Sequence, residues 1–235
     1  MLLDGVHLVS EALTAGVRVR EAAVVASAVE AGGVAGIVEQ LDRAGAETFI
    51  VTAPVMAALS AVRSSSSIVA LADRPVRYDR VFAAPAPLVV VAIDVQDPGN
   101  IGAIVRVAEA AGATGVIAAG ASADPYGWKA LRGSMGSAFR VPILVAKEGW
   151  SLGELRQRKC RVVATVPHGG RPLFDVHLDG PSAILIGAEG RGLAPELVAQ
   201  ADERVSIPME APVESLNAAV TAALLLYEAR RQRMH

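Results

Sequence analysis

Ile207-Pro208-Met209-Glu210-Ala211-Pro212-Val213-Glu214-Ser215-Leu216-Asn217-Ala218-Ala219 is the stretch that decides the fold. It joins a predicted strand at 204–207 to a helix through a proline-bearing polar loop. Ser215 or Asn217 can cap that helix by accepting a backbone N–H. Apolar residues at helical spacing over 216–227 predict one apolar face of the helix. A strand, a loop and a helix in this order are typical of an α/β sheet.

Two earlier segments place polar or glycine-rich loops at the ends of predicted strands, where open α/β sheets bind ligands. The run 88–93 leads into Asp94-Val95-Gln96-Asp97-Pro98-Gly99-Asn100-Ile101-Gly102 and a helix carrying Arg106. The run 183–187 leads into Gly187-Ala188-Glu189-Gly190-Arg191-Gly192-Leu193. Its glycines permit close backbone approach, and their spacing matches neither a dinucleotide fingerprint nor a P-loop. Such a loop can present N–H and C=O groups to a nucleoside.

Strands alternate with helices throughout the second part of the chain. Because βαβ units give parallel pairing, the pattern predicts a mostly parallel sheet. We expect Asn100 to cap the first helix of this part. Strands are predicted at 88–93, 115–119, 141–146, 161–166, 183–187 and 204–207, and helices at 100–111, 151–159, 195–200 and after 215.

The first part has its own helix and strand pattern, followed by a charged, proline-rich stretch that predicts a linker. Proline lacks the N–H that a central strand needs. The expected domains are 1–72, a linker at 73–87, and 88–235. Helices are predicted at 6–15 and 34–44 and from Ala53, and strands at 17–26, 48–52 and 68–71.

Charge and cysteine content exclude several classes of protein. A net charge of −2 excludes a global positive field, so any nucleic-acid partner would have to be held by local arginine clusters. Cys160 is the only cysteine, which excludes an internal disulfide and a cysteine metal site and fits a reducing cytoplasm. No basic signal region and no apolar run of about 18 residues is present, so we expect no membrane association.

The three segments together resemble the SpoU family of RNA 2′-O-methyltransferases, part of the SPOUT class. The resemblance covers about residues 88–233 and includes the stretch 132–139. The family's D-x-P-G-N-x-G-x-x-x-R pattern is similar to Asp94 through Arg106, its G-x-E-G-x-G-L pattern to 187–193, and its I-P-M-x-x-x-x-E-S-L-N-A-A pattern to 207–219. The first part, including 5–13, is more weakly similar to the family's N-terminal substrate-binding domain, which resembles ribosomal protein L30e.

The resemblance implies an α/β fold with a trefoil-knotted methyltransferase domain behind a small L30e-like α/β domain. It further implies a homodimer with S-adenosylmethionine near the dimer interface, ribosomal RNA as the substrate and no metal. The implied cofactor-binding residues lie in three loops and the last helix: Thr165, Val166, Pro167, Gly187, Glu189, Gly190, Gly192, Ile207, Met209, Ser215, Leu216 and Ala219.

The implied catalytic residues are Arg106 and its polar partners Asn100, Glu189, Ser215 and Asn217. A general-base role for Arg106 meets a physical obstacle, because the neutral guanidine costs roughly 7–9 kcal/mol at pH 7. A guanidinium that holds phosphate and orients the ribose is the more conservative role. Both roles stay open.

We expect RNA contacts from Arg18, Arg20, Lys129 and Arg132, while aromatic residues are too few for a broad stacking surface. Three alternatives remain: a tRNA ribose methyltransferase, a catalytically silent RNA-binding assembly factor, and a nucleotide-dependent oxidoreductase. Intact Arg106, Glu189 and Asn217 argue against the second, and the missing dinucleotide fingerprint argues against the third.

Overall fold

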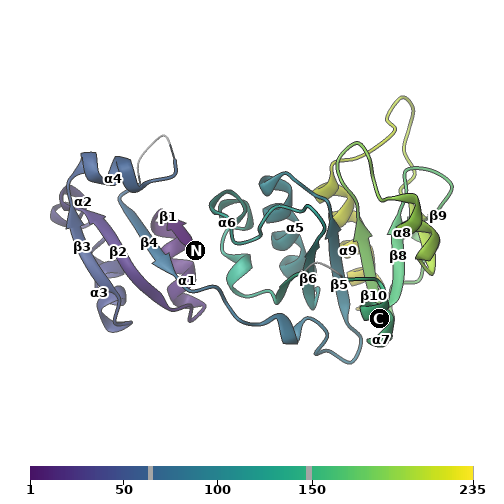
Figure 1. Ribbon diagram of the computed structural model, residues 1–235, viewed down its shortest axis with the longest axis horizontal. Coiled ribbons are helices and arrows are strands. Elements are labelled where there is room, and N and C mark those ends of the chain that lie inside the picture. The colour runs from purple at the N-terminus through teal and green to yellow at the C-terminus, as the bar shows by residue number, and fades with distance from the viewer. Residues whose placement is uncertain (63–65, 147–149, 235) are drawn as a thin grey trace.

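Two β-sheets follow one another along the chain in the computed structural model, which describes residues 1–62, 66–146 and 150–234 (Figure 1). The first sheet has the strand order β1-β4-β2-β3, and within it only β2 and β3 pair in parallel. Its elements are β1 (Leu2–Asp4), α1 (Val6–Thr14), β2 (Val19–Val25), α2 (Ala26–Glu30), α3 (Ala35–Arg43), β3 (Glu47–Val51), α4 (Ala53–Leu59) and β4 (Ile68–Ala72). Between the two sheets lies the short 3-10 helix Tyr78–Arg80.

The second sheet is parallel throughout its described pairs, with the order β7-β6-β5-β10-β8-β11-β9. The chain inserts β10 between β5 and β8 only after it has formed β8 and β9. The trefoil knot implied for this region stays a prediction. The strands are β5 (Leu88–Ile93), β6 (Gly115–Ala119), β7 (Ile143–Val145), β8 (Arg161–Thr165), β9 (Arg171–Pro172), β10 (Ser182–Ile186) and β11 (Glu203–Ser206).

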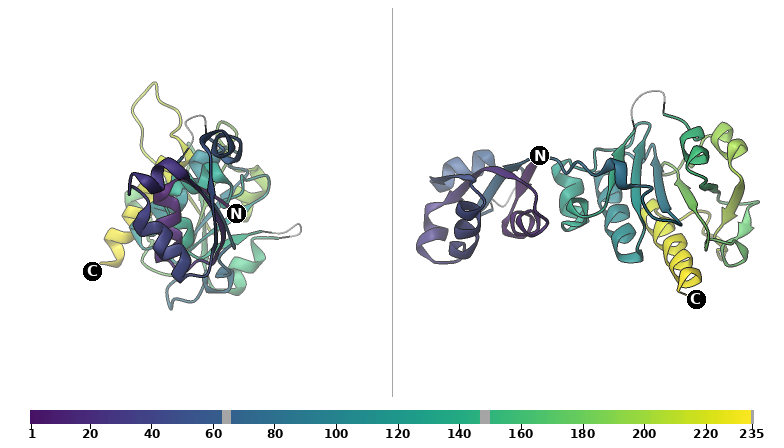
Figure 2. Two further views of the ribbon diagram at one scale, coloured as in Figure 1. Left: turned by 90° about the vertical axis from the view of Figure 1, so that its left-hand side faces the viewer. Right: turned by 90° about the horizontal axis from the view of Figure 1, so that it is seen from below.

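Helices cover both faces of the second sheet. Alternate residues of a strand point to opposite faces, so Val90 packs in the cluster shared with α5 and α9, while Val89 packs in the cluster with Leu155 of α7. Figure 2 shows α9, in yellow, on one side of this sheet. The helices are α5 (Pro98–Ala111), α6 (Trp128–Ser134), α7 (Gly153–Gln157), α8 (Pro195–Gln200) and α9 (Ala218–Arg233).

Asp97, and not Asn100, caps α5. Its carboxylate accepts a hydrogen bond from the Gly99 N–H at 2.7 Å. Pro98 occupies the first turn, where its missing N–H is not needed. The predicted cap was therefore wrong, and the helix begins two residues earlier than expected. Asn100 consequently lies inside the first turn with its side chain free for other partners.

The last helix buries a different face from the one that its spacing predicted. Asn217 caps it, as one of the two expected residues. The buried residues are Ala218, Ala219, Ala222, Leu225, Leu226, Glu228 and Ala229. Val220, Leu224 and Tyr227, which belong to the predicted apolar face, are 47%, 41% and 52% exposed. The helix is apolar on two sides, and only one of them meets the sheet.

Four elements were missed from the sequence. These are β1, α2, α6 and β9. β1 pairs with β4 over only three residues, and β9 contributes only two. Over the three described ranges, no helix has the length and apolar character needed to cross a membrane.

Arg140 forms ion pairs with both parts of the chain. Its guanidinium donates to Glu109 of α5 at 2.5 and 3.0 Å and to Glu11 of α1 at 2.5 Å. Burial alone would raise the pKa of Glu109, but the hydrogen bonds from Arg140 and Ser137 outweigh it and lower that pKa. The same ion pairs raise the pKa of Arg140.

We expect Glu109→Gln to destabilise the protein by about 1–2 kcal/mol at pH 7, since the pair is about one-third exposed. A carboxyl whose pKa is lowered on folding adds stability above its unfolded pKa and loses it as the pH falls through the folded value. The gap between variant and wild type should therefore shrink below about pH 4. Urea unfolding at pH 7 and pH 3.5 measures the difference in unfolding free energy between the two proteins. An equal difference at both pH values would contradict a stabilising role of the Glu109 carboxylate.

Candidate functional site

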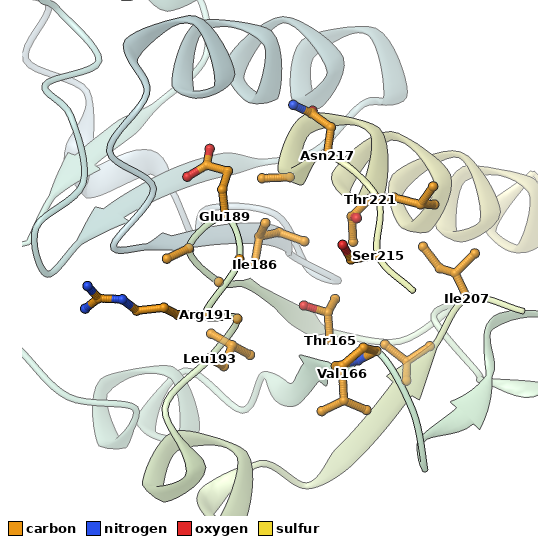
Figure 3. Close-up of a pocket in the computed structure, with 18 of the residues that line it drawn as sticks. Thr165, Val166, Ile186, Glu189, Arg191, Leu193, Ile207, Ser215, Asn217 and Thr221 are labelled. Atoms are coloured by element: carbon orange, nitrogen blue, oxygen red, sulfur yellow. The ribbon is translucent and has the colours of Figure 1, made fainter. Parts of the chain in front are cut away.

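A cavity of about 390 Å³ opens at the carboxyl ends of three adjacent strands (Figure 3). Its walls come from the loops after β8, β10 and β11 and from the start of α9. Cavities of this size hold small molecules. Two of the three sequence segments predicted to bind a ligand, 187–193 and 207–219, therefore line one space together with the loop after β8.

The loop after β10 closes tightly on itself because Gly187 has no side chain. A Cβ atom at Gly187 would lie 2.3 Å from the carbonyl carbon of Gly192 and 2.5 Å from the nitrogen of Leu193. The Gly192 N–H donates to the Ala188 carbonyl at 2.9 Å, which holds the turn. The backbone of this turn thus forms one wall of the cavity.

Three polar side chains from the three segments join at the rim of the cavity. Asn217 Nδ2 donates to Asn100 Oδ1 at 2.9 Å, and Asn100 Nδ2 donates to Glu189 Oε1 at 2.5 Å. The same Asn217 accepts the Ala219 and Val220 N–H groups through Oδ1, at 2.9 and 3.3 Å. The cap of α9 thereby fixes the amide that orients Asn100, which in turn orients the Glu189 carboxylate. We call these three side chains the rim network.

Eleven of the twelve residues expected to bind the cofactor line this cavity. The exception is Ala219, which is buried at 8% exposure outside the lining. Those that line it are Thr165, Val166, Pro167, Gly187, Glu189, Gly190, Gly192, Ile207, Met209, Ser215 and Leu216.

Arg106 does not lie on the lining of this cavity. It is exposed on α5, six residues beyond Asn100, which is about 9 Å along the helix and turned by roughly 120° from it. Within the described residues its side chain has no ion pair or hydrogen bond. Of the predicted catalytic residues, the structure joins Asn100, Glu189 and Asn217, places Ser215 on the cavity wall, and leaves Arg106 apart.

The sequence did not single out the apolar floor of the cavity. Leu193, Val198 and Val205 line it together with Ile186. Val198 comes from α8, whose packing no local pattern reveals. Thr221, one turn into α9, also lines the cavity, and the four-residue spacing from the predicted cap Asn217 could have indicated it.

The expected RNA contacts differ in their surroundings. Arg20 donates to Asp73 at 2.5 and 3.2 Å, so its charge is already paired, whereas Arg18 is exposed. Lys129 and Arg132 lie 5.4 and 5.9 Å from the centre of the Trp128 ring. No group of three or more His, Cys, Asp or Glu able to hold a metal ion occurs in the part of the chain that the structure describes.

Asn217→Asp should separate capping from orientation. An aspartate still caps α9 through its carboxylate, so we expect stability within about 0.5 kcal/mol of wild type. It cannot donate to Asn100 and adds a negative charge beside Glu189, so catalytic turnover should fall roughly 100-fold. Asn217→Ala should lose the cap as well, at about 1 kcal/mol. Thermal unfolding and turnover measured on both variants test this, and an active Asn217→Asp enzyme would exclude the orienting role.

Known proteins similar to this chain are methyltransferases. An uncharacterised tRNA/rRNA methyltransferase of Synechocystis is 30% identical over 99% of this chain and 84% of its own length. The 23S rRNA (guanosine(2553)-2′-O)-methyltransferase RlmP of Bacillus subtilis is 30% identical over 97% of this chain and 88% of its own. The crystal structure of the SpoU methyltransferase AviRb from Streptomyces viridochromogenes, in complex with AdoMet, matches with a TM-score of 0.88 at 32% identity, covering 100% of this chain and 90% of that one.

The parallel sheet, the cavity built from three loops and these relatives define an RNA methyltransferase. Residues 87–227 match the SpoU rRNA Methylase family. The chain belongs to that family, as its three sequence segments predicted.

Proposed function

We propose that this protein transfers the methyl group of S-adenosylmethionine to a ribose 2′-hydroxyl of 23S ribosomal RNA. The observation that carries the proposal is the rim network, which joins the three family segments at the mouth of one cavity. A relative similar over almost the full chain is named for 2′-O-methylation of 23S rRNA, and a matching structure for its complex with AdoMet.

The cavity fits the cofactor in both size and chemistry. At about 390 Å³ it suits a nucleoside-sized ligand, and Leu193, Val198 and Val205 supply apolar contacts. Backbone groups of the loops at 165–167 and 187–192 would hold its polar edges. The cofactor supplies a methyl group bonded to a sulfonium sulfur. After transfer that sulfur is a neutral thioether, so the leaving group requires no metal.

The protein's own residues have two tasks, to orient the ribose hydroxyl and to help its proton leave. The rim network suits the first task, because Glu189 is held by Asn100 and can accept a hydrogen bond from a ribose hydroxyl. Ser215 lies on the cavity wall and offers a further polar contact. We assign Arg106 to holding RNA phosphate and orienting the ribose, since the planar guanidinium matches two phosphate oxygens at once.

In this proposal Arg106 acts at the cavity of a second copy of the chain. The exposed residues Val220, Leu224 and Tyr227 form an apolar stripe on α9. Phe174, 70% exposed, lines a groove together with Leu224 and Tyr227. Such a surface suits a homodimer interface. With the cofactor near that interface, Arg106 of one copy would act on the ribose at the other copy's cavity.

We also propose that residues 1–72 form the RNA substrate-binding domain, that 73–87 link it to the methyltransferase domain at 88–235, and that the protein acts in the cytoplasm. Cys160, buried and unpaired, suits a reducing compartment. An L30e-like domain favours structured ribosomal RNA over tRNA as the substrate.

The test is methyl transfer from labelled S-adenosylmethionine to unmodified 23S rRNA, with unmodified tRNA in parallel. We expect label in the large RNA alone, recovered after nuclease digestion as a 2′-O-methyl nucleoside. Label in tRNA would overturn 23S rRNA as the substrate and assign tRNA instead. Cofactor binding without transfer to either RNA would overturn the proposal in favour of a binding factor.

A further inference from the structure

Helix α6 carries two cations around one aromatic ring, a cluster that the proposed chemistry does not use. Lys129 Nζ lies 5.4 Å and Arg132 Cζ 5.9 Å from the centre of the Trp128 ring. Both cations are exposed, and Trp128 is partly exposed. We call Trp128, Lys129 and Arg132 the α6 platform.

The two cations of the platform have no carboxylate partner within the described ranges. This distinguishes them from arginines elsewhere in the chain that do pair with Asp or Glu: Arg20, Arg43, Arg74, Arg140, Arg156, Arg161, Arg171 and Arg231. Two like charges beside one ring repel each other unless an anion lies between them. A phosphate group would relieve that repulsion and bind both cations.

The contacts between the two cations and the ring are long. Distances of 5.4 and 5.9 Å lie near the outer limit of about 6 Å for a cation–π contact, so the cations sit loosely against the indole. An unstacked nucleobase gains about 1–3 kcal/mol by stacking on such a ring. An aromatic ring flanked by phosphate-binding cations suits a single-stranded nucleotide better than a duplex, whose bases are already stacked.

Backbone packing connects the platform rigidly to the rim network. A Cβ atom at Gly102 would lie 2.4 Å from the Ala130 carbonyl oxygen and 2.9 Å from Gly133 Cα, so α5 and α6 touch main chain to main chain. Asn100 stands two residues before this contact. Trp128 lies five residues before Gly133, about 7.5 Å along α6. A few nucleotides of single-stranded RNA are longer than this distance.

The position of α6 in the fold agrees with contact to the same RNA. Figure 1 places α6 between the first sheet and α5. An RNA that reached from residues 1–72 to the cavity would therefore pass over this helix.

We propose that the α6 platform binds an unpaired nucleotide of the RNA substrate a few positions from the methylated one. The base stacks on Trp128, and its flanking phosphates contact Lys129 and Arg132. This inference rests on the proposed function for the identity of the RNA, whereas the stacking itself is independent of methyl transfer.

Stacking is measured directly by tryptophan fluorescence. Trp128 and Trp150 are the only tryptophans, so Trp150→Phe leaves Trp128 as the sole reporter. The probe is a nine-nucleotide single-stranded RNA of mixed sequence, with its duplex as the control. We expect quenching by the single strand and far less by the duplex. Equal quenching by both, or none by the single strand, would overturn the inference.

The kinetic test compares Trp128→Ala, Trp128→Phe and Tyr78→Ala on unmodified 23S rRNA made by transcription in vitro. Tyr78 is the matched control, an aromatic residue 57% exposed outside the platform. Trp128→Ala should raise the KM for RNA roughly 5- to 150-fold with kcat and cofactor affinity unchanged. Trp128→Phe keeps an aromatic ring, so its KM should lie close to that of wild type. Lys129→Ala and Arg132→Ala should each reduce the salt slope of RNA binding by about 0.7.

A KM for Trp128→Ala within twofold of that of wild type would exclude the platform while leaving the methyltransferase proposal intact. Conversely, quenching by single-stranded RNA in an enzyme that methylates no RNA would support the platform and exclude the proposed function.

Discussion

Gly187→Ala is expected to weaken cofactor binding severely. The added Cβ would lie 2.3–2.6 Å from three backbone atoms of Gly192 and Leu193, so the glycine loop must open. Backbone cannot move aside as a flexible side chain does, and we expect a loss of about 1–3 kcal/mol in stability. Because this loop is one wall of the cavity, affinity for S-adenosylmethionine should fall at least 100-fold.

Isothermal titration with S-adenosylmethionine measures the effect. Gly36→Ala is the matched control, since Gly36 lies in α3 with nothing within 4 Å of an added Cβ. That control should bind the cofactor normally and gain up to about 1 kcal/mol in stability. If Gly187→Ala kept normal affinity in a folded protein, the loop would not form the cofactor site.

Arg106→Ala is expected to lower kcat by roughly 1,000-fold with unchanged cofactor affinity and stability. The side chain is exposed and lies outside the cavity lining, so its removal disturbs neither the core nor the cofactor. Arg106→Lys separates the two possible roles. If Arg106 orients the ribose, Arg106→Lys should lose most of the activity, because lysine lacks the planar guanidinium that binds two oxygens at once. A general base would instead work better as lysine, whose neutral form is about 2–3 pKa units easier to reach.

The same variant tests whether Arg106 acts across a dimer. In the proposed homodimer, Arg106→Ala chains mixed with Gly187→Ala chains would form heterodimers in which one cavity is intact and faces the intact Arg106 of the other chain. Equal mixing should then recover about a quarter of wild-type activity, because half the dimers are mixed and each has one working site. A mixture as inactive as its parts would place Arg106 at the cavity of its own chain.

The fold of the second part of the chain was predictable from periodicity. The runs 88–93 and 115–119 became β5 and β6 with the predicted bounds, because strands buried on both faces are continuously apolar. The burial of α9 was not predictable. Its Ala- and Leu-rich sequence is apolar on two sides, and only packing against α5 and β10 decides which side is buried.

Two cavity walls, the loops after β10 and β11, were predictable because each follows a strand and has an unusual sequence, whereas the loop after β8 was implied only by the family resemblance. The hydrogen bonds that join Asn100, Glu189 and Asn217 were not predictable. Asn100 and Glu189 are 89 residues apart, and Asn100 and Asn217 are 117 residues apart. No local pattern pairs side chains over such separations. The exact start of α5 was likewise missed, since Asp97 and Asn100 are both good caps and Pro98 decided between them.

The separation within the rim network also sets when the enzyme becomes active during its own synthesis. At about 5–20 residues per second, a ribosome makes Asn217 roughly 6 to 23 seconds after Asn100. Until then the nascent chain holds β5, β6 and later β10 but lacks the start of α9 and one wall of the cavity. A product of interrupted translation that stops before residue 217 would therefore contain most of the sheet and no complete site. The growing chain would be unable to modify RNA until translation is almost complete.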